Sequence, residues 1–247
     1  MILYVTSFFA TLFFSALFAT GGMGSSIVLI PILGFLGVDF NLAKAVGLFI
    51  NTTTTSTASF LNWRRQLLDF STITPFLIAS VCCAPIGTYC ASIWNVEYIK
   101  LAFVVFLFFS SAKIFFRGST PHEEIVKCKW AMFPLGLGVG FLAGLLGIGG
   151  GALIVPVLFA MGFSPIQIAI NASFMIPFST MSAFLSYAGL ITIDWTLIGV
   201  TTTASMLGGF VGNRIMHAKL KNTDIKNVLC LAMCLVGLKM LYDILAV

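Results

Sequence analysis

Long apolar runs alternate with short polar stretches along the whole chain, and most runs have the length of a membrane-spanning helix. A helix rises about 1.5 Å per residue, so some 20 residues cross the ~30 Å hydrocarbon layer of a bilayer. The runs are too long and continuous to be barrel strands. The pattern predicts helices over residues 2–20, 25–37, 42–62, 71–94, 97–116, 130–146, 150–162, 165–188, 194–216 and 224–246.

Two of these segments, 25–37 and 150–162, are too short to cross a bilayer as straight helices. Thirteen residues span about 20 Å. Each segment follows a glycine-rich turn, Gly21-Gly22-x-Gly24 in the first case and Gly147-x-Gly149-Gly150-Gly151 in the second. Glycine is expected inside an apolar region where the backbone breaks or is approached closely. We therefore predict that a short broken helix begins at each turn.

The two halves of the chain repeat one another. Gly22 and Gly147, Pro31 and Pro156, and Gly87 and Gly212 all stand 125 residues apart. The repeat predicts two units of five segments each, with about eight long spans and two short ones in all. The first unit covers residues 1–116, a polar cytoplasmic linker covers 117–129, and the second unit covers 130–247.

Composition places the chain among all-α polytopic membrane proteins. It is 59% hydrophobic and 9% charged, whereas a soluble domain carries about 25% charged residues. The net charge of +5 does not indicate a nucleic-acid partner, because the basic residues lie in short loops, where they set membrane orientation. The cysteines and histidines lack metal-ligand spacing, so we expect no metal and no cofactor.

Basic residues also predict how the two units are oriented. If the short segments count as crossings, ten basic residues share one side of the membrane and three lie on the other, in agreement with the positive-inside rule. If they do not, the basic loops fall on opposite sides. The sequence thus predicts inverted repeats with both termini outside. The ten are Arg64, Arg65, Lys113, Arg117, Lys127, Lys129, Arg214, Lys219, Lys221 and Lys226, and the three are Lys44, Lys100 and Lys239.

The motif Gly144-x-x-Gly147-x-Gly149-Gly150-Gly151-x-x-x-x-Pro156 and its weaker copy from Gly21 to Pro31 resemble the TauE/SafE sulfite-exporter family. In the first copy Ser25 and Ser26 replace two glycines. The resemblance covers nearly the whole chain. It implies a multi-pass permease of the bacterial inner membrane that moves sulfur-containing anions such as sulfite, sulfonates, sulfoacetate or thiosulfate.

The two glycine turns form the predicted substrate site. Gly22, Gly24, Ser25 and Ser26 would lie opposite Gly147, Gly149, Gly150 and Gly151. A helix N-terminus offers unpaired N–H groups and the positive end of the helix dipole, which suit an anion. The alternative is that these glycines only allow close helix packing. For the separate stripe Gly136-x-x-x-Gly140-x-x-x-Gly144, we prefer packing.

Polar residues within two spans are further candidate ligands. Asn51, Thr52 and Thr55 belong to one polar stretch, and Asn171 and Ser173 to its counterpart. Their amides and hydroxyls could bind substrate oxygens without a fixed charge. The alternative for the hydroxyls is a bond to a carbonyl one turn back on the same helix.

The remaining charged residues have simpler explanations. Asp69 and Asp194 each precede a predicted helix, which favours helix capping over proton transfer. Lys44 or Arg214 could attract an anion at a cavity mouth, or extend to the lipid headgroups. Gly147-x-Gly149-x-x-Ala152 fits a dinucleotide motif but follows a helix and lacks the acidic residue that such sites need.

The sequence as a whole predicts a secondary transporter that moves a small sulfur-containing anion by alternating access. Enzymatic chemistry is not expected, because no nucleophile or metal motif occurs. Either H+ or Na+ could be the coupling ion. An anion channel with the same pore and a non-transporting membrane subunit are the two alternatives.

Overall fold

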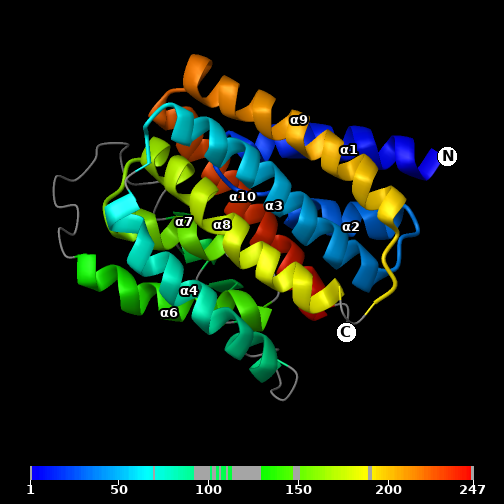
Figure 1. Ribbon diagram of the computed structural model, residues 1–247, viewed down its shortest axis with the longest axis horizontal. Coiled ribbons are helices and arrows are strands. Elements are labelled where there is room, and N and C mark those ends of the chain that lie inside the picture. Colours follow the sequence, from blue (N-terminus) through cyan, green and yellow to red (C-terminus); the bar gives the residue numbers. More distant parts are fainter. Residues whose placement is uncertain are drawn as a thin grey trace.

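The computed structural model describes residues 2–68, 70–91, 129–146, 151–188 and 191–245, together with short stretches between 101 and 112. The regular structure in these residues is helical, with no strand (Figure 1). The helices are α1 (Ile2–Ala19), α2 (Ser26–Phe35), α3 (Phe40–Arg64), α4 (Phe70–Ala91), α6 (Lys129–Leu146), α7 (Gly151–Ala160), α8 (Pro165–Ala188), α9 (Trp195–Lys219) and α10 (Asn222–Leu245). The predicted helices are confirmed within these ranges; most of 97–116 and residues 117–128 of the linker lie outside them.

The duplication expected from residue spacing is visible in the helix boundaries. α2, α3 and α4 begin at residues 26, 40 and 70, and α7, α8 and α9 begin at 151, 165 and 195, each 125 positions later. Both short helices also end in the same way. Gly37 has a φ of 86° and Gly162 a φ of 88°, the left-handed conformation that favours glycine at a helix C-terminus. The division into units 1–116 and 130–247 stays a prediction.

The outer helices pack across the two halves of the chain. α1 packs along α9, α6 packs along α4, and α3 and α8 lie against one another in the centre (Figure 1). The first helix of each half thus pairs with the fourth helix of the other. The closest contacts repeat as well: a Cβ on Gly212 would lie 2.2 Å from the Ala16 carbonyl oxygen, and one on Gly87 would lie 2.0 Å from that of Phe141. Both partners are again 125 residues apart.

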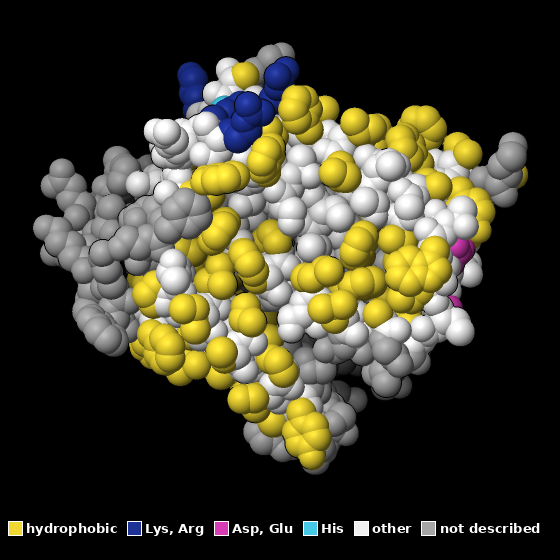
Figure 2. All heavy atoms as spheres, in the orientation of Figure 1, with side chains coloured by type: hydrophobic (Ala, Val, Ile, Leu, Met, Phe, Trp, Pro, Cys, Tyr) yellow, Lys and Arg dark blue, Asp and Glu magenta, His cyan; other side chains and the backbone are white. Residues whose placement is uncertain are grey.

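The two central helices, α3 and α8, run in opposite directions. Thr52 of α3 bonds Thr180 of α8, while Asn62, further along α3, bonds the earlier Ser173, so these two helices are antiparallel (Figure 1). The register of close contacts makes α9 parallel to α1 and α6 parallel to α4. Asn62 of α3 bonds Asn213 of α9, and the earlier Thr53 bonds the earlier Ser205, so these two helices are parallel and end at the same end of the bundle. Arg64 belongs to the last turn of α3, and Lys and Arg side chains gather at one end of the face shown in Figure 2.

The glycine stripe on α6 serves packing, as the sequence indicated. A Cβ on Gly136 would lie 2.4 Å from the Phe76 carbonyl oxygen, and one on Gly140 would lie 2.3 Å from that of Ser80. Only glycine permits so close an approach of the two backbones. The surroundings of Gly144 lie outside the described part of the chain.

The outer helix α1 is polar on the inside and apolar on the outside. Ser7, Thr11 and Ser15 are buried, whereas Phe9 and Phe13 are each 63% exposed. This is the reverse of a helix on a water-soluble protein, and it is the arrangement that lipid on the outer face requires. Hydrophobic side chains also cover much of the face shown in Figure 2.

Two helices in the described residues are long and apolar enough to cross a membrane by length and composition, Ile2–Ala19 and Pro165–Leu185. Ile73–Gly87 and Met132–Ala143 are shorter apolar helices. α3 has 25 residues, enough for about 37 Å, but its hydroxyl and amide side chains lower its mean hydropathy. The expected number of eight long spans therefore remains a prediction.

Candidate functional site at the N-terminus of α2

The turn before α2 approaches both central helices so closely that it requires glycine. Gly22 has a φ of 67°, and a Cβ there would lie 1.9 Å from the Ala169 carbonyl oxygen of α8. A Cβ on Gly24 would lie 0.7 Å from Oδ1 of Asn51 on α3. The Asn51 amide thus occupies the space that a side chain at position 24 would need. The turn places the start of α2 between α3 and α8.

Ser25 and Ser26, at the start of α2, are fully buried, and the Ser25 hydroxyl does not cap the helix. Ser25 stands at the N-cap position but makes no side-chain capping bond. Its Oγ instead lies 2.9 Å from Oγ of Ser15 on α1, which also accepts a bond of 3.1 Å from Thr54 of α3. The N-terminus of α2 is thereby held to α1 and α3, while its own N–H groups receive no help from the capping serine.

Two buried oxygens at this helix start have no partner within the described residues. They are Oγ of Ser26 and Oδ1 of Asn51, and these side chains are 0% and 2% exposed. An unsatisfied buried polar group costs about 1–3 kcal/mol, so a water molecule or ligand is expected beside it. Because the N-terminus carries the positive end of the helix dipole, the position suits an anion.

The second half does not repeat this polar arrangement. Gly151 opens α7 at the position equivalent to Ser26, and a Cβ on it would lie 3.1 Å from Cδ1 of Ile176, the position equivalent to Asn51. Where the first half has a hydroxyl and an amide, the second has a glycine and a hydrocarbon side chain. Gly147, Gly149 and Gly150 lie outside the described residues, so their predicted part in the site stays a prediction.

The predicted hydroxyl ligands mostly bond to the backbone of their own helix. Thr52 donates to the Leu48 carbonyl at 3.0 Å and shares a hydrogen bond of 2.8 Å with Thr180. Thr55 donates to the Asn51 carbonyl at 2.6 Å. The alternative considered for these hydroxyls is confirmed, since their protons bond within the helix. Thr52 belongs to the central contact between α3 and α8 through its bond to Thr180.

The remaining predicted residues, Asn171 and Ser173, belong to α8. Ser173 donates to the Ile170 carbonyl and accepts a bond of 3.1 Å from Asn62. Asn171 is buried, and its part in the site stays a prediction. The structure thus unites Gly22, Gly24, Ser25, Ser26 and Asn51, whereas Ser173 belongs to a separate contact with Asn62.

Asn62 is the centre of a buried polar network that sequence analysis missed. Its Oδ1 accepts bonds of 2.9 Å from Nδ2 of Asn213 and from Nε2 of His217, both on α9. With the bond to Ser173, the network joins α3, α8 and α9 near the end of the bundle that carries Arg64. Two asparagines near arginines at the ends of predicted spans, Asn62 and Asn213, were the available signal in the sequence.

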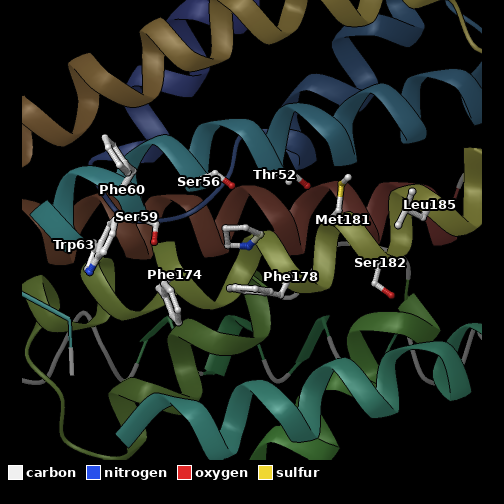
Figure 3. Close-up of a pocket in the computed structure, with 11 residues that line it drawn as sticks. Thr52, Ser56, Ser59, Phe60, Trp63, Phe174, Phe178, Met181, Ser182 and Leu185 are labelled. Carbon is white, nitrogen blue, oxygen red and sulfur yellow. The ribbon is translucent and has the colours of Figure 1, made fainter. Parts of the chain in front are cut away.

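A cavity of about 820 Å3 lies between α3 and α8 (Figure 3). Several of its side chains are exposed, so it opens on the surface of the bundle; Phe60 is 52% exposed and Leu185 60%. Thr52 is the predicted site residue that lines it. The other lining residues are Ser56, Ser59, Phe60, Trp63, Phe174, Pro177, Phe178, Met181, Ser182 and Leu185.

Of the charged residues considered from the sequence, Asp194 has the expected capping role. Its Oδ1 accepts the N–H groups of Thr196 and Leu197 at 2.9 and 3.0 Å. Arg214 lies over the ring of Phe210 on its own helix, 4.7 Å from the ring centroid. That contact places Arg214 on the surface of α9, not at the start of α2. Asp69 lies outside the described residues.

Comparison with known proteins places this architecture in a family. The family model described as Sulfite exporter TauE/SafE matches residues 7–240. The chain belongs to the TauE/SafE family. No solved structure matches it significantly.

Relatives of this TauE/SafE chain carry transporter names. It is 24% identical to a probable membrane transporter protein, YunE, of Bacillus subtilis (strain 168), over 90% of this chain and 91% of that protein. It is 28% identical to a probable membrane transporter protein of Methanocaldococcus jannaschii over 67% of this chain and 65% of that protein. A TauE/SafE family protein of Arabidopsis thaliana is 36% identical over 46% of this chain and 20% of its own length. Membership supports an integral membrane transporter.

Proposed function

We propose that this TauE/SafE protein is a secondary transporter that moves a small sulfur-containing anion across the bacterial inner membrane by alternating access. The observation that carries the proposal is the buried N-terminus of α2, where Oγ of Ser26 and Oδ1 of Asn51 find no partner within the described residues. The anion binds there, close to the middle of the bundle.

The chemistry of the position matches a sulfite or sulfonate group. Such a group offers three acceptor oxygens, and the Ser26 hydroxyl can donate to one of them. Rotation of the Asn51 amide by half a turn replaces its carbonyl oxygen with NH2, which adds further donors. Neither α2 nor α3 contains an acidic residue. The site binds an anion through neutral donors and the helix dipole. Because its described residues include no cationic side chain, it can also release the anion.

The relation between the halves supports alternating access. The equivalent helices α3 and α8 are antiparallel, and the short helices α2 and α7 occupy corresponding places in each half. Inverted repeats of this kind carry their substrate between the two repeats near the bilayer midplane. The shared end of α3 and α9, with Arg64 and Arg214, faces the cytoplasm under the positive-inside rule.

Substitution of Asn51 by isoleucine tests the site with the residue that the protein itself uses at the equivalent position, Ile176. Purified wild-type protein is screened by thermal unfolding against sulfite, sulfonates, sulfoacetate and thiosulfate, since a ligand of the folded form raises the melting temperature. We expect Asn51→Ile to remove the shift, and Ile176→Val, the matched control, to keep it. An equal shift in Asn51→Ile would place the anion elsewhere.

Counterflow of labelled sulfite in proteoliposomes separates transport from the alternatives. Saturable exchange supports a carrier, and flux that rises without saturation indicates an anion channel. If the protein neither binds nor transports any of these anions, the remaining alternative is a non-transporting membrane subunit. Repeating the assay with a pH gradient and then with a sodium gradient identifies H+ or Na+ as the coupling ion.

A further inference from the structure

The buried face of α1 carries one hydroxyl per helical turn. Ser7, Thr11 and Ser15 are each 0% exposed, and α1 runs parallel to α9 along this face. Gly208 of α9 lies against Ser15, and a Cβ on this glycine would lie 2.8 Å from Cβ of Ser15. Two turns toward the start of both helices bring Ser7 to the level of residue 200. We call this contact between the helices the α1–α9 seam.

Two of the three hydroxyls have no hydrogen-bond partner in the described part of the chain, Oγ of Ser7 and Oγ1 of Thr11. Other hydroxyls in these helices, such as those of Thr6 on α1 and Thr201 on α9, donate to a carbonyl three or four residues earlier. Ser7 and Thr11 do not use that option. A buried polar oxygen left without a protein partner is normally satisfied by an ordered water molecule.

The equivalent seam in the second half shows that helix packing does not require hydroxyls here. The positions 125 residues after Ser7, Thr11 and Ser15 are Met132, Gly136 and Gly140. Met132 is 1% exposed, and both glycines allow α6 to contact the backbone of α4. The same packing problem is thus solved by a dry seam in one half and by a row of hydroxyls in the other.

The spacing of the hydroxyls suits water. Four residues of helix rise about 6 Å, and one water molecule that bonds two oxygens at ~2.8 Å each spans nearly the same distance. At one end of the row, Tyr4 donates to Oδ2 of Asp194 at the start of α9. At the other end, Ser15 bonds Ser25 at the N-terminus of α2. The row therefore connects the end of the bundle to the proposed anion site.

We infer that the α1–α9 seam is a hydrated path along which Ser7, Thr11 and Ser15 hold single-file water between the Tyr4 end of the bundle and the start of α2. The seam lets water reach the start of α2 from that end of the bundle, and its role in transport rests on the proposed function. Water in the file satisfies the unpartnered oxygens. The α4–α6 seam remains dry.

Silver ions test the path because they have nearly the size of water and react with thiolates. The six native cysteines, Cys82, Cys83, Cys90, Cys128, Cys230 and Cys234, are first replaced by alanine. Ser7→Cys and Thr11→Cys are then compared with Met132→Cys, an equally buried position in the dry seam, and with lipid-facing Phe9→Cys. Proteoliposomes are treated with silver nitrate in chloride-free buffer, and the remaining thiols are counted with a maleimide after denaturation.

A thiol beside water ionises far more readily than one in an apolar contact, so we expect Ser7→Cys and Thr11→Cys to react roughly tenfold faster or more than Met132→Cys. Equal rates at positions 7, 11 and 132 would overturn the path. Silver reactivity without any anion binding would keep the path and reject the proposed function. Sulfite binding and transport with unreactive thiols would keep the proposed function and reject the path.

A second measurement needs no substitution. Hydroxyl radicals formed by X-ray pulses from internal water modify the side chains next to that water. In the wild-type protein we expect modification of Phe18, which is buried on the same face of α1, and none of Met132, although methionine is the more easily oxidised side chain. Modification of Met132 without Phe18 would contradict a hydrated α1–α9 seam.

Discussion

Gly24→Ala is the sharpest perturbation of the proposed anion site, because it acts on Asn51 without changing it. The backbone at Gly24 lies outside the left-handed region, so alanine can adopt its conformation. The added Cβ, however, would lie 0.7 Å from Oδ1 of Asn51 and 1.9 Å from its Cγ. Asn51 must therefore leave its place over the start of α2.

Two costs follow from this displacement. Loss of one hydrogen bond to a charged ligand is worth about 1.5–3 kcal/mol, which weakens anion binding roughly 10- to 150-fold. Crowding in a packed interior costs a further ~1–3 kcal/mol of stability. For a protein of this size such a cost lowers the melting temperature by about 2–12 °C. The variant should therefore fold, with a reduced melting temperature and little response to the anion.

Gly34→Ala, within α2 itself, is the matched control. A Cβ at Gly34 meets nothing within 4 Å, and replacing a glycine inside a helix by alanine gains up to ~1 kcal/mol. The assay is the melting temperature of each purified variant across a sulfite titration, with sulfate as a second anion. Wild-type affinity in Gly24→Ala would refute the idea that Asn51 above the α2 N-terminus holds the ligand.

Three further substitutions test the packing and the polar contacts. Gly140→Ala places a Cβ 2.3 Å from a backbone oxygen of α4 and should cost about 1–3 kcal/mol; Gly138→Ala meets nothing within 4 Å and should melt no lower than wild type. Equal melting temperatures would contradict the tight α4–α6 contact. Asp194→Ala removes two capping bonds and should cost about 0.5–2 kcal/mol, seen as faster amide exchange in the first turn of α9; unchanged exchange there would show that the cap is dispensable. Asn62→Ala removes the oxygen that Asn213 and His217 of α9 both bond and should lower stability by about 1–3 kcal/mol, whereas an unchanged melting curve would mean that water replaces the amide.

Much of the architecture could be predicted because it depends on local rules and on repetition. Apolar runs of helical length predict helices in any apolar solvent, and glycine before Ser26 and before Gly151 predicts a broken backbone. The spacing of 125 residues needed no spatial information either, since duplicated units keep their sequence offsets. Asp194 was recognisable as a cap because capping involves only its own first helical turn.

Contacts between distant helices could not be predicted in this way. The duplication suggested that both glycine turns serve one site, with further ligands from the polar stretches that contain Asn51 and Asn171. Packing decided otherwise in the first half: Asn51 lies over Gly24, and the equivalent position in the second half holds Ile176. Which side chain faces a helix end depends on the rotation and crossing of the neighbouring helix, and these are set by the whole bundle.

The row of hydroxyls on α1 shows most clearly what the sequence determines and what only the tertiary structure decides. The sequence by itself determined that Ser7, Thr11 and Ser15 share one face of a helix, because they recur every four residues. It could not decide whether those hydroxyls bond to their own helix, to a neighbour, or to neither. Only the tertiary structure decided that α9 covers them and leaves two oxygens without a protein partner in the described residues, because hydrogen-bond satisfaction is a property of the assembled interior.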